Sequence, residues 1–144
     1  DGRDIRVFDL RAEDGGPLPP WTPGAHLRLT LPVGLTRCYS LCNAPGDDDF
    51  YRIAVKREPG SRGGSAWLHE QAAVGLQLEA GLPVNAFALL DGAQPAALFA
   101  VGIGITLIYA MARTCDIAAA PSSCTTSRAA SIMPPCSHSC RSRV

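Results

Sequence analysis

Short strand-like segments separated by turn residues dominate residues 1–91 of the chain. Apolar and polar residues alternate in 5–10 and again in 26–31, as expected of strands with one buried face. Residues 37–42, 50–55 and 76–80 also have the composition of short strands, and Gly and Pro clusters punctuate the intervals. This order predicts a mainly β fold and favours a closed antiparallel barrel over a parallel sheet. Residues 65–71 are the first expected helix, with Ser65 as its N-cap.

The composition changes at Ala93. The apolar run Ala97–Val101 predicts a strand buried on both faces. Gly102 and Gly104 predict a turn, and residues 107–113 have helical spacing, so this stretch is typical of the first strand-turn-helix of an α/β nucleotide-binding domain. No further unit of this kind follows. We therefore expect a β-barrel domain at 1–92, an incomplete nucleotide-binding domain at 93–113, and a disordered tail at 114–144.

Charge and hydropathy exclude several classes of function. Thirteen Lys and Arg balance thirteen Asp and Glu, so the formal net charge is zero and nothing favours nucleic-acid binding. No apolar run reaches the roughly 18 residues that a membrane span needs. The N-terminus has neither Met nor an apolar signal core, so we expect a cytoplasmic protein rather than a secreted or membrane one.

The six cysteines do not form the pattern of a disulfide framework, because four of them lie in the last thirty residues. Cys136, His138 and Cys140 leave open a small zinc-binding interaction module, although this spacing is a weak zinc signal. His26 and His69 are expected to be structural, and no spacing of residues supports a nucleophilic triad. We therefore predict no catalytic side chain.

A candidate flavin site begins at Arg37, Tyr39 and Ser40. Arginine pairs with a phosphate through two parallel hydrogen bonds. A Tyr ring can cover the isoalloxazine face, and a Ser hydroxyl can bond the edge of the ring near its reactive nitrogen. The alternative is an ordinary strand with an exposed Arg and a cross-strand Tyr.

Two glycine-containing turns add to this pattern. Gly63-Gly64-Ser65 precedes the expected helix, where free N–H groups and the helix dipole favour a phosphate. A flexible loop is the alternative, but the spacing from Arg37, with Val55-Lys56-Arg57 between them, favours a site. Gly102 and Gly104 follow an apolar run, as in a dinucleotide turn, with tight strand–helix packing as the alternative. Thr106 is suited either to capping the next helix or to touching the flavin.

Together these residues resemble the flavin-dependent reductase components of Rieske-type aromatic oxygenases, the phthalate dioxygenase reductase and vanillate O-demethylase reductase group of the ferredoxin–NADP reductase-like superfamily. The resemblance extends from Asp1 to about Arg113. It is specific at five segments: Gly24-Ala25-His26, Arg37 to Asn43, Ile53 to Arg57, Arg62 to Ser65, and Gly102 to Thr106.

The resemblance implies a six-stranded antiparallel barrel that binds FMN, then an NAD-binding α/β domain and a [2Fe–2S] domain. Hydride passes from NADH to the flavin, and electrons pass through the cluster to the oxygenase partner. FMN is favoured over FAD because the flavin site that the resemblance implies ends where the phosphate is bound.

The resemblance also implies a role for each matching residue. The FMN phosphate would be held by Arg37, Ser65 and the amides of Gly63 and Gly64. The isoalloxazine would be lined by Cys38, Tyr39 and Ser40, and contacted from the neighbouring strand by Ala54, Val55 and Lys56. Thr106 would close the flavin site, and the NAD pyrophosphate turn would begin at Gly102 and Gly104.

The chain departs from this family at specific points. Val101 stands where the family usually has glycine, and Leu107 where it has proline. The resemblance ends after Arg113, and the 144 residues contain no cluster loop Cys-x4-Cys-x2-Cys, so we expect the [2Fe–2S] domain of the family to be absent from this chain. A Phe-Glu-Leu-His-Tyr strand of the family, read one nucleotide late, gives Ser-Ser-Cys-Thr, and this chain has that sequence at 122–125. We therefore hypothesise a frameshift between Arg113 and Pro121.

These departures predict a fragment of an FMN- and NADH-dependent oxidoreductase that binds flavin but oxidises NADH inefficiently. Two alternatives stay open. One is a non-catalytic flavin-binding remnant, and the other is the zinc-binding module described above.

Overall fold

The computed structural model describes residues 4–44, 46–47, 49–89, 97–118 and 139–143, although the side chains of 116–118 and 139–143 are outside this description. The strands are β1 (Ile5–Arg11), β2 (Ala25–Thr30), β3 (Thr36–Ser40), β4 (Tyr51–Lys56), β5 (Glu79–Ala80), β6 (Val84–Asn85) and β7 (Ser139–Arg143). The helices are α1 (Gly64–Gln71), the 3₁₀-helix η2 (Gly102–Gly104) and α2 (Ile105–Ala118).

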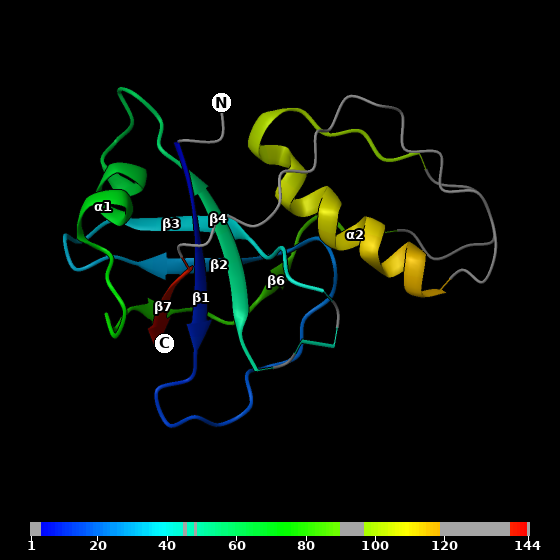
Figure 1. The fold of residues 1–144 in the computed structure, drawn as a ribbon, viewed down its shortest axis with the longest axis horizontal. Coiled ribbons are helices and arrows are strands. Elements are labelled where there is room, and N and C mark those ends of the chain that lie inside the picture. Colours follow the sequence, from blue (N-terminus) through cyan, green and yellow to red (C-terminus); the bar gives the residue numbers. More distant parts are fainter. Residues whose placement is uncertain (1–3, 45, 48, 90–96, 119–138, 144) are drawn as a thin grey trace.

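The strands form two sheets, which cross steeply in Figure 1. One has the order β4-β1-β7, and the other has the order β3-β2-β5 with β6 also paired to β2. All pairs are antiparallel except β1 with β7, which is parallel. Outside the named strands, the described residues join the sheets by one bridge, Leu41 to Ile53. The expected mainly β, antiparallel fold is confirmed, but a closed six-stranded barrel is not found in the part that the structure describes.

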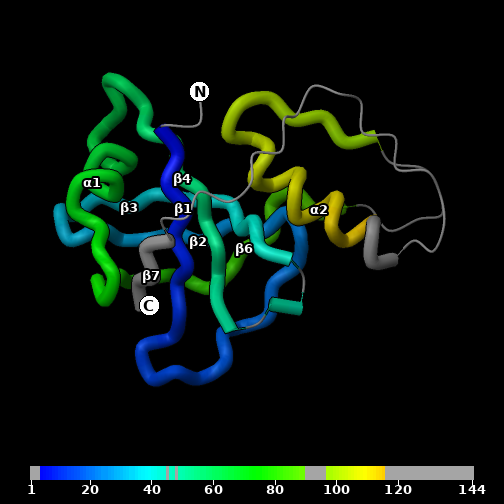
Figure 2. Tube along the Cα trace, in the orientation of Figure 1, coloured from blue at the N-terminus to red at the C-terminus, as the bar shows by residue number. Residues whose placement is uncertain are grey.

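The apolar residues of the alternating segments meet between the two sheets. The core residues are almost fully buried: Phe8, Leu10, Ala25, Leu27, Leu29, Leu31, Leu41, Tyr51, Ile53, Val55, Leu68 and Leu78. Leu68 comes from α1, which closes one end of the core, whereas α2 lies at the opposite end of the view (Figures 1 and 2). The large number of fully buried side chains explains why these short strands hold together, since an isolated pair of strands is only marginally stable.

The first expected helix is present but begins differently. Gly63 is the N-cap of α1, with a φ of 91°, and no side chain caps the helix. The prediction of Ser65 as N-cap is therefore wrong. A glycine can adopt this left-handed conformation without strain, so the chain enters the helix two residues earlier than the Ser hydroxyl suggested. The sixth strand, β6, is only two residues long and carries no alternation that would have predicted it.

The segment Ala97–Val101 is not the doubly buried strand that its composition predicts. It pairs with no strand in the described residues, and Phe99 and Val101 are 84% and 92% exposed. A strand buried on both faces requires neighbouring strands, and none lies here in the described part of the chain. The expected turn at Gly102 and Gly104 is the 3₁₀-helix η2, and the helix that follows is α2.

The expected tail at 114–144 is described only in part. Helix α2 continues past Arg113 to Ala118, and Ser139–Arg143 form β7 beside β1. Residues 119–138 and 144 lie outside the described residues, so the domain division at 92 and 113 stays a prediction. Among the described helices, none is long and apolar enough to cross a bilayer.

Candidate functional site

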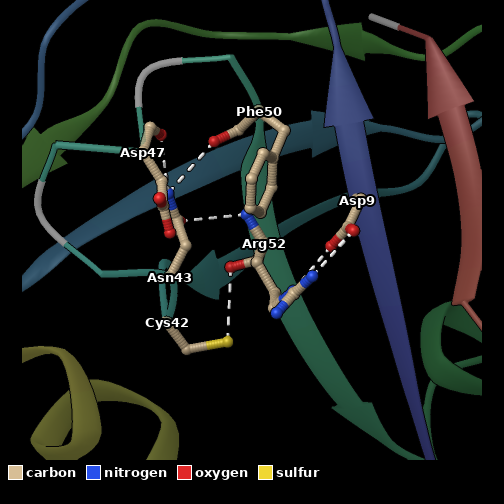
Figure 3. A network of polar contacts seen from close by, with 6 residues as sticks. All are labelled: Asp9, Cys42, Asn43, Asp47, Phe50 and Arg52. Atoms are coloured by element: carbon tan, nitrogen blue, oxygen red, sulfur yellow. Dashed lines mark hydrogen bonds and ion pairs between the residues drawn. The ribbon is translucent and has the colours of Figure 1, made fainter. Parts of the chain in front are cut away.

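A network of polar contacts fixes the connection between β3 and β4 (Figure 3). The amide of Asn43 donates to the carbonyl of Phe50, and its side-chain oxygen accepts from the backbone N–H of Arg52, both at 3.1 Å. The guanidinium of Arg52 donates two hydrogen bonds to the carboxylate of Asp9 on β1. Its carbon Cζ also lies over the ring of Phe50, 5.0 Å from the ring centroid. Because Asn43 and Asp9 are buried, the ends of these strands are held in one arrangement.

The edge of β4 that faces away from β1 carries two of the predicted flavin contacts. The N–H of Cys42 donates to the carbonyl of Arg52 across this edge at 2.9 Å. Backbone groups of alternate residues in a strand point the same way, so the N–H and C=O of Ala54 and Lys56 also face this edge. In the described part of the chain, the isolated bridge of Leu41 with Ile53 is the pairing on this edge, and no named strand pairs with β4 beyond it.

The facing edge of β3 carries Cys38 and Ser40. The N–H of Leu41 donates to the carbonyl of Ala25 on β2, so the backbone groups of Cys38 and Ser40 point the other way, toward β4. We call the two facing strand edges beyond the Leu41–Ile53 bridge, Cys38–Ser40 and Ala54–Lys56, the open edge. Backbone groups of this edge that the bridge does not engage can bond a flat polar ring.

Val55 occupies a different position from its two neighbours. It lies opposite Arg6 of β1, and its side chain belongs to the core at 2% exposure. Its carbonyl oxygen lies 2.8 Å from Nε2 of His69 on α1. The predicted contact of Val55 with a flavin therefore has no side-chain support, whereas the residues on either side present their backbone groups to the open edge.

Arg37 lies against the start of α1. Its Nη1 donates to the carbonyl of Thr36 at 2.8 Å and its Nη2 to the carbonyl of Arg62 at 3.1 Å. A Cβ on Gly64 would lie 2.9 Å from Cγ of Arg37, so only glycine allows this close approach. The structure thus places a guanidinium beside the first turn of a helix, where backbone N–H groups have no helical partner.

The loop before α1 is closed by three hydroxyl contacts. Ser65 Oγ accepts from the N–H of Glu58 at 3.2 Å and lies 3.2 Å from Oγ of Ser61. Ser61 Oγ in turn accepts from the N–H of Gly63 at 3.3 Å. Ser61 is not among the residues expected from the sequence, although Ser hydroxyls in turns commonly bond nearby backbone N–H groups. Lys56 is paired with Glu58 at 2.9 Å.

Tyr39 and its two neighbours point to different faces of the sheet. Tyr39 lies opposite the buried Leu27, and burial raises the pKa of its hydroxyl while the charge of Arg37 offsets part of the rise. Cys38 and Ser40 instead line a cavity of about 220 Å³, together with His26, Phe87 and Leu107 of α2. The expected grouping of Cys38, Tyr39 and Ser40 is thus split between the two faces of β3.

The residues expected from the second domain lie in η2 and the first turn of α2. The hydroxyl of Thr106 donates to the carbonyl of Ile103 at 3.0 Å, which is a local contact at the helix start. Gly102 has a φ of 59° and, like Gly104, is exposed with open space around it. η2 lies close to β4, and Leu107 adjoins the cavity, so this segment borders the open edge.

The expected zinc ligands cannot be compared with a site. Cys136 and His138 lie outside the described residues, and only the backbone of Cys140 is described, in β7. Among the described residues, no three His, Cys, Asp or Glu side chains gather closely enough to hold a metal ion.

An antiparallel β unit, closed at one end by a short helix and followed by a glycine turn and a second helix, is the arrangement of the flavin-binding part of ferredoxin reductase-like proteins. The solved structure of a phthalate dioxygenase reductase matches with a TM-score of 0.74 and 44% identity, over 77% of this chain and 35% of that one. The flavohem-like FAD/NAD-binding domain of a nitric oxide dioxygenase from Vibrio cholerae matches with a TM-score of 0.63 and 28% identity, over 78% and 57%.

The sequence comparison agrees with this class. The phenoxybenzoate dioxygenase subunit beta of Ectopseudomonas oleovorans is 52% identical over 108 residues, which are 75% of this chain and 34% of that protein. No protein-family model matches. The chain is thus a homologue of the reductase components of Rieske-type oxygenases, among them phthalate dioxygenase reductase and vanillate O-demethylase oxidoreductase. It spans about a third of the length of the curated relatives it matches.

Proposed function

We propose that the chain binds FMN at the open edge, as the flavin-binding unit of an electron-transfer reductase for an aromatic oxygenase or O-demethylase. The observation that carries the proposal is the contact of Arg37 with Gly64, which puts a fixed cation at the start of α1. A phosphate there gains both the guanidinium and the free amides of the helix. The homology with oxygenase reductases supports the same assignment.

The remaining parts of the site follow from this phosphate position. Cys38 and Ser40 on one edge, and Ala54 and Lys56 on the other, would bond the isoalloxazine through their backbone groups. Ser65 and Gly63 belong to the phosphate end, and Tyr39 lies on the face of β3 shared with Arg37. A bound flavin would supply hydride acceptance and one-electron transfer, whereas the protein would hold and orient it.

FMN is proposed over FAD because the cation and the helix start stand together at one end of the site. The terminal phosphomonoester of FMN carries up to about two negative charges, whereas each phosphate of the pyrophosphate in FAD carries about one. The six antiparallel strands β1–β6, within residues 1–92, are proposed as the flavin-binding domain of this reductase.

A first experiment is a titration of the purified chain with FMN, FAD and riboflavin, followed by flavin fluorescence. We expect FMN to bind more tightly than riboflavin, and Arg37→Ala to remove about tenfold or more of the FMN affinity, because a charge-assisted hydrogen bond is lost. Arg6→Ala, an exposed arginine on β1, is the matched control and should leave the affinity unchanged. Equal binding of FMN and riboflavin by the parent chain would rule out the phosphate site.

A second candidate function is flavin binding without turnover of NADH. The exposure of Phe99 and Val101 favours it, since the segment predicted as the first strand of a nicotinamide-binding domain pairs with no strand in the described residues. Anaerobic addition of NADH to the flavin-loaded chain separates the two. Bleaching of the flavin band at a rate above that of free FMN would support the reductase, and an unchanged band would support the non-catalytic binder.

A further inference from the structure

Two hydrogen bonds fasten one face of α1 to the end of β4. Nε2 of His69 lies 2.8 Å from the carbonyl oxygen of Val55, and Oγ of Ser65 accepts from the N–H of Glu58 at 3.2 Å. Because a carbonyl only accepts, Nε2 of His69 carries the proton and donates. Ser65 and His69 are four residues apart on a helix, so they lie on the same face, one turn apart. We call this pair of bonds the α1 clasp.

The clasp joins the two ends of the proposed flavin site. The segment it holds, Val55 to Glu58, contains Lys56, whose backbone groups face the open edge. The helix that it holds begins at Gly64, which contacts Arg37. The separation between the ring end and the phosphate end of the site is therefore set where α1 meets the end of β4.

The other contacts of α1 are less suited to fix this separation. Leu68 anchors the helix in the core at 1% exposure, but apolar burial has little directionality and allows a helix to slide or rotate by small amounts. The ion pair of Arg57 with Glu70 is 2.5 Å long but both side chains are half-exposed, so it contributes little. The bond of His69 is directional and almost fully buried, since His69 is only 8% exposed.

We propose that His69, with Ser65, is a positioning residue that holds the phosphate end of the site in register with its ring end. This inference rests on the proposed flavin function and adds a residue to it that does not touch the ligand. Its consequence is specific. Loss of the clasp should weaken the contribution of the phosphate group to binding, and it should leave the contribution of the ring almost unchanged.

The test compares His69→Leu, which removes the donor, with His69→Gln, whose side-chain amide can still donate to the carbonyl of Val55. Glu70→Gln is the control on the same helix. In the flavin-free proteins, hydrogen–deuterium exchange over residues 61–71 is followed by mass spectrometry. We expect faster exchange in His69→Leu only. Unchanged exchange in His69→Leu would overturn the inference without any flavin being present.

In the second measurement, the dissociation constants for FMN and riboflavin are determined for each variant. For His69→Leu we expect FMN affinity to fall about tenfold and riboflavin affinity to change by less than about twofold, as for the loss of one buried hydrogen bond acting on the phosphate end. His69→Gln should keep most of the FMN preference. An equal loss for both ligands, or a full FMN preference in His69→Leu, would overturn the positioning role.

The outcome also separates this inference from the proposed function. If the parent chain shows no preference for FMN over riboflavin, the phosphate site fails, and the positioning role toward it fails with it. If the parent chain prefers FMN and His69→Leu keeps that preference, the flavin site stands and only the role of His69 is wrong.

Discussion

The carboxylate of Asp9 on β1 accepts two hydrogen bonds from the guanidinium of Arg52 on β4, at 2.7 and 2.8 Å. The Asp9 side chain is 6% exposed and the Arg52 side chain 38%. This bond raises the pKa of Arg52, so the pair stays charged. Because Asp9 is far more buried than Arg52, we expect the loss of the arginine to cost more stability than the loss of the carboxylate charge.

Arg52→Met is expected to destabilise the protein more than Asp9→Asn. The first change leaves a buried carboxylate without its partner, whereas the second leaves an arginine that water can reach. We expect losses of about 2–3 kcal/mol and about 1 kcal/mol in the free energy of unfolding, respectively. Urea unfolding measures both, and the reverse order would contradict the assigned burial of Asp9.

Cys42 is expected to make the folded state sensitive to alkaline pH. Burial raises the pKa of its thiol to about 12, with the charge of Arg52 opposing the rise and that of Asp9 adding to it. Between the ordinary thiol pKa, near 9, and about 12, only the unfolded chain loses the proton. Stability is therefore fully present below about pH 9 and falls above it, by up to about 1.4 kcal/mol per pH unit.

The variant Cys42→Ala lacks this contribution, so its stability should fall less between pH 8 and pH 10 than that of the parent chain. Peptide-resolved thiol labelling gives an independent check. The exposed Cys38 should react at pH 8 while Cys42 does not. Rapid labelling of Cys42 in the folded protein would contradict its burial.

Gly64→Ala is expected to weaken FMN binding without destabilising the fold. The added methyl group would lie 2.9 Å from Cγ of Arg37, so the guanidinium must move, while alanine suits the helix. We expect a loss of affinity of about fivefold to tenfold, from a displaced charge-assisted contact. Gly81→Ala is the control, because its methyl group would meet Arg28 only at an ordinary 3.7 Å. Equal affinities for the two variants would argue against the Arg37–Gly64 contact.

The apolar segment before η2 is expected to limit solubility. Replacing Phe99 and Val101 by Ser should change the free energy of unfolding by no more than about 0.5 kcal/mol, because both side chains are exposed. It should also raise the protein concentration at which light scattering begins, since exposed apolar patches promote association. By contrast, Phe8→Ala should cost about 3–5 kcal/mol, as expected for a core aromatic. A comparable loss for the Phe99 and Val101 variant would show that these residues are buried.

The strands were predictable where alternation and turn residues agreed. Residues 5–10 and 26–31 lie within one residue of β1 and β2, because their burial is set by local period and one sheet face. The prediction of a buried strand at Ala97–Val101 was wrong because burial on both faces does not depend on local pattern. Its composition says that it prefers burial, but burial needs neighbouring strands, which no local pattern can supply.

For the proposed site, the sequence predicts a set of residues but not how they are arranged in space. The spacing of Arg37 and Gly64 suggested a phosphate site, and the structure brings the two together. The opposite faces of Tyr39 and Ser40, the inward side chain of Val55 and the bond of His69 follow from strand register and tertiary packing. Gly24 illustrates the same limit, since a Cβ there would lie 2.0 Å from the carbonyl oxygen of Phe87, a residue far away in the sequence.

In the described residues, the two sheets stop pairing after the bridge between Leu41 and Ile53, and the proposed site lies just beyond that bridge. Unpaired strand edges usually invite unwanted association, and proteins protect them. A substitution that extended pairing beyond this bridge would add hydrogen bonds and rigidity, and it would also remove the backbone groups offered to a ligand. Selection for a more stable fold and selection for ligand binding would thus act in opposite directions on the same few residues.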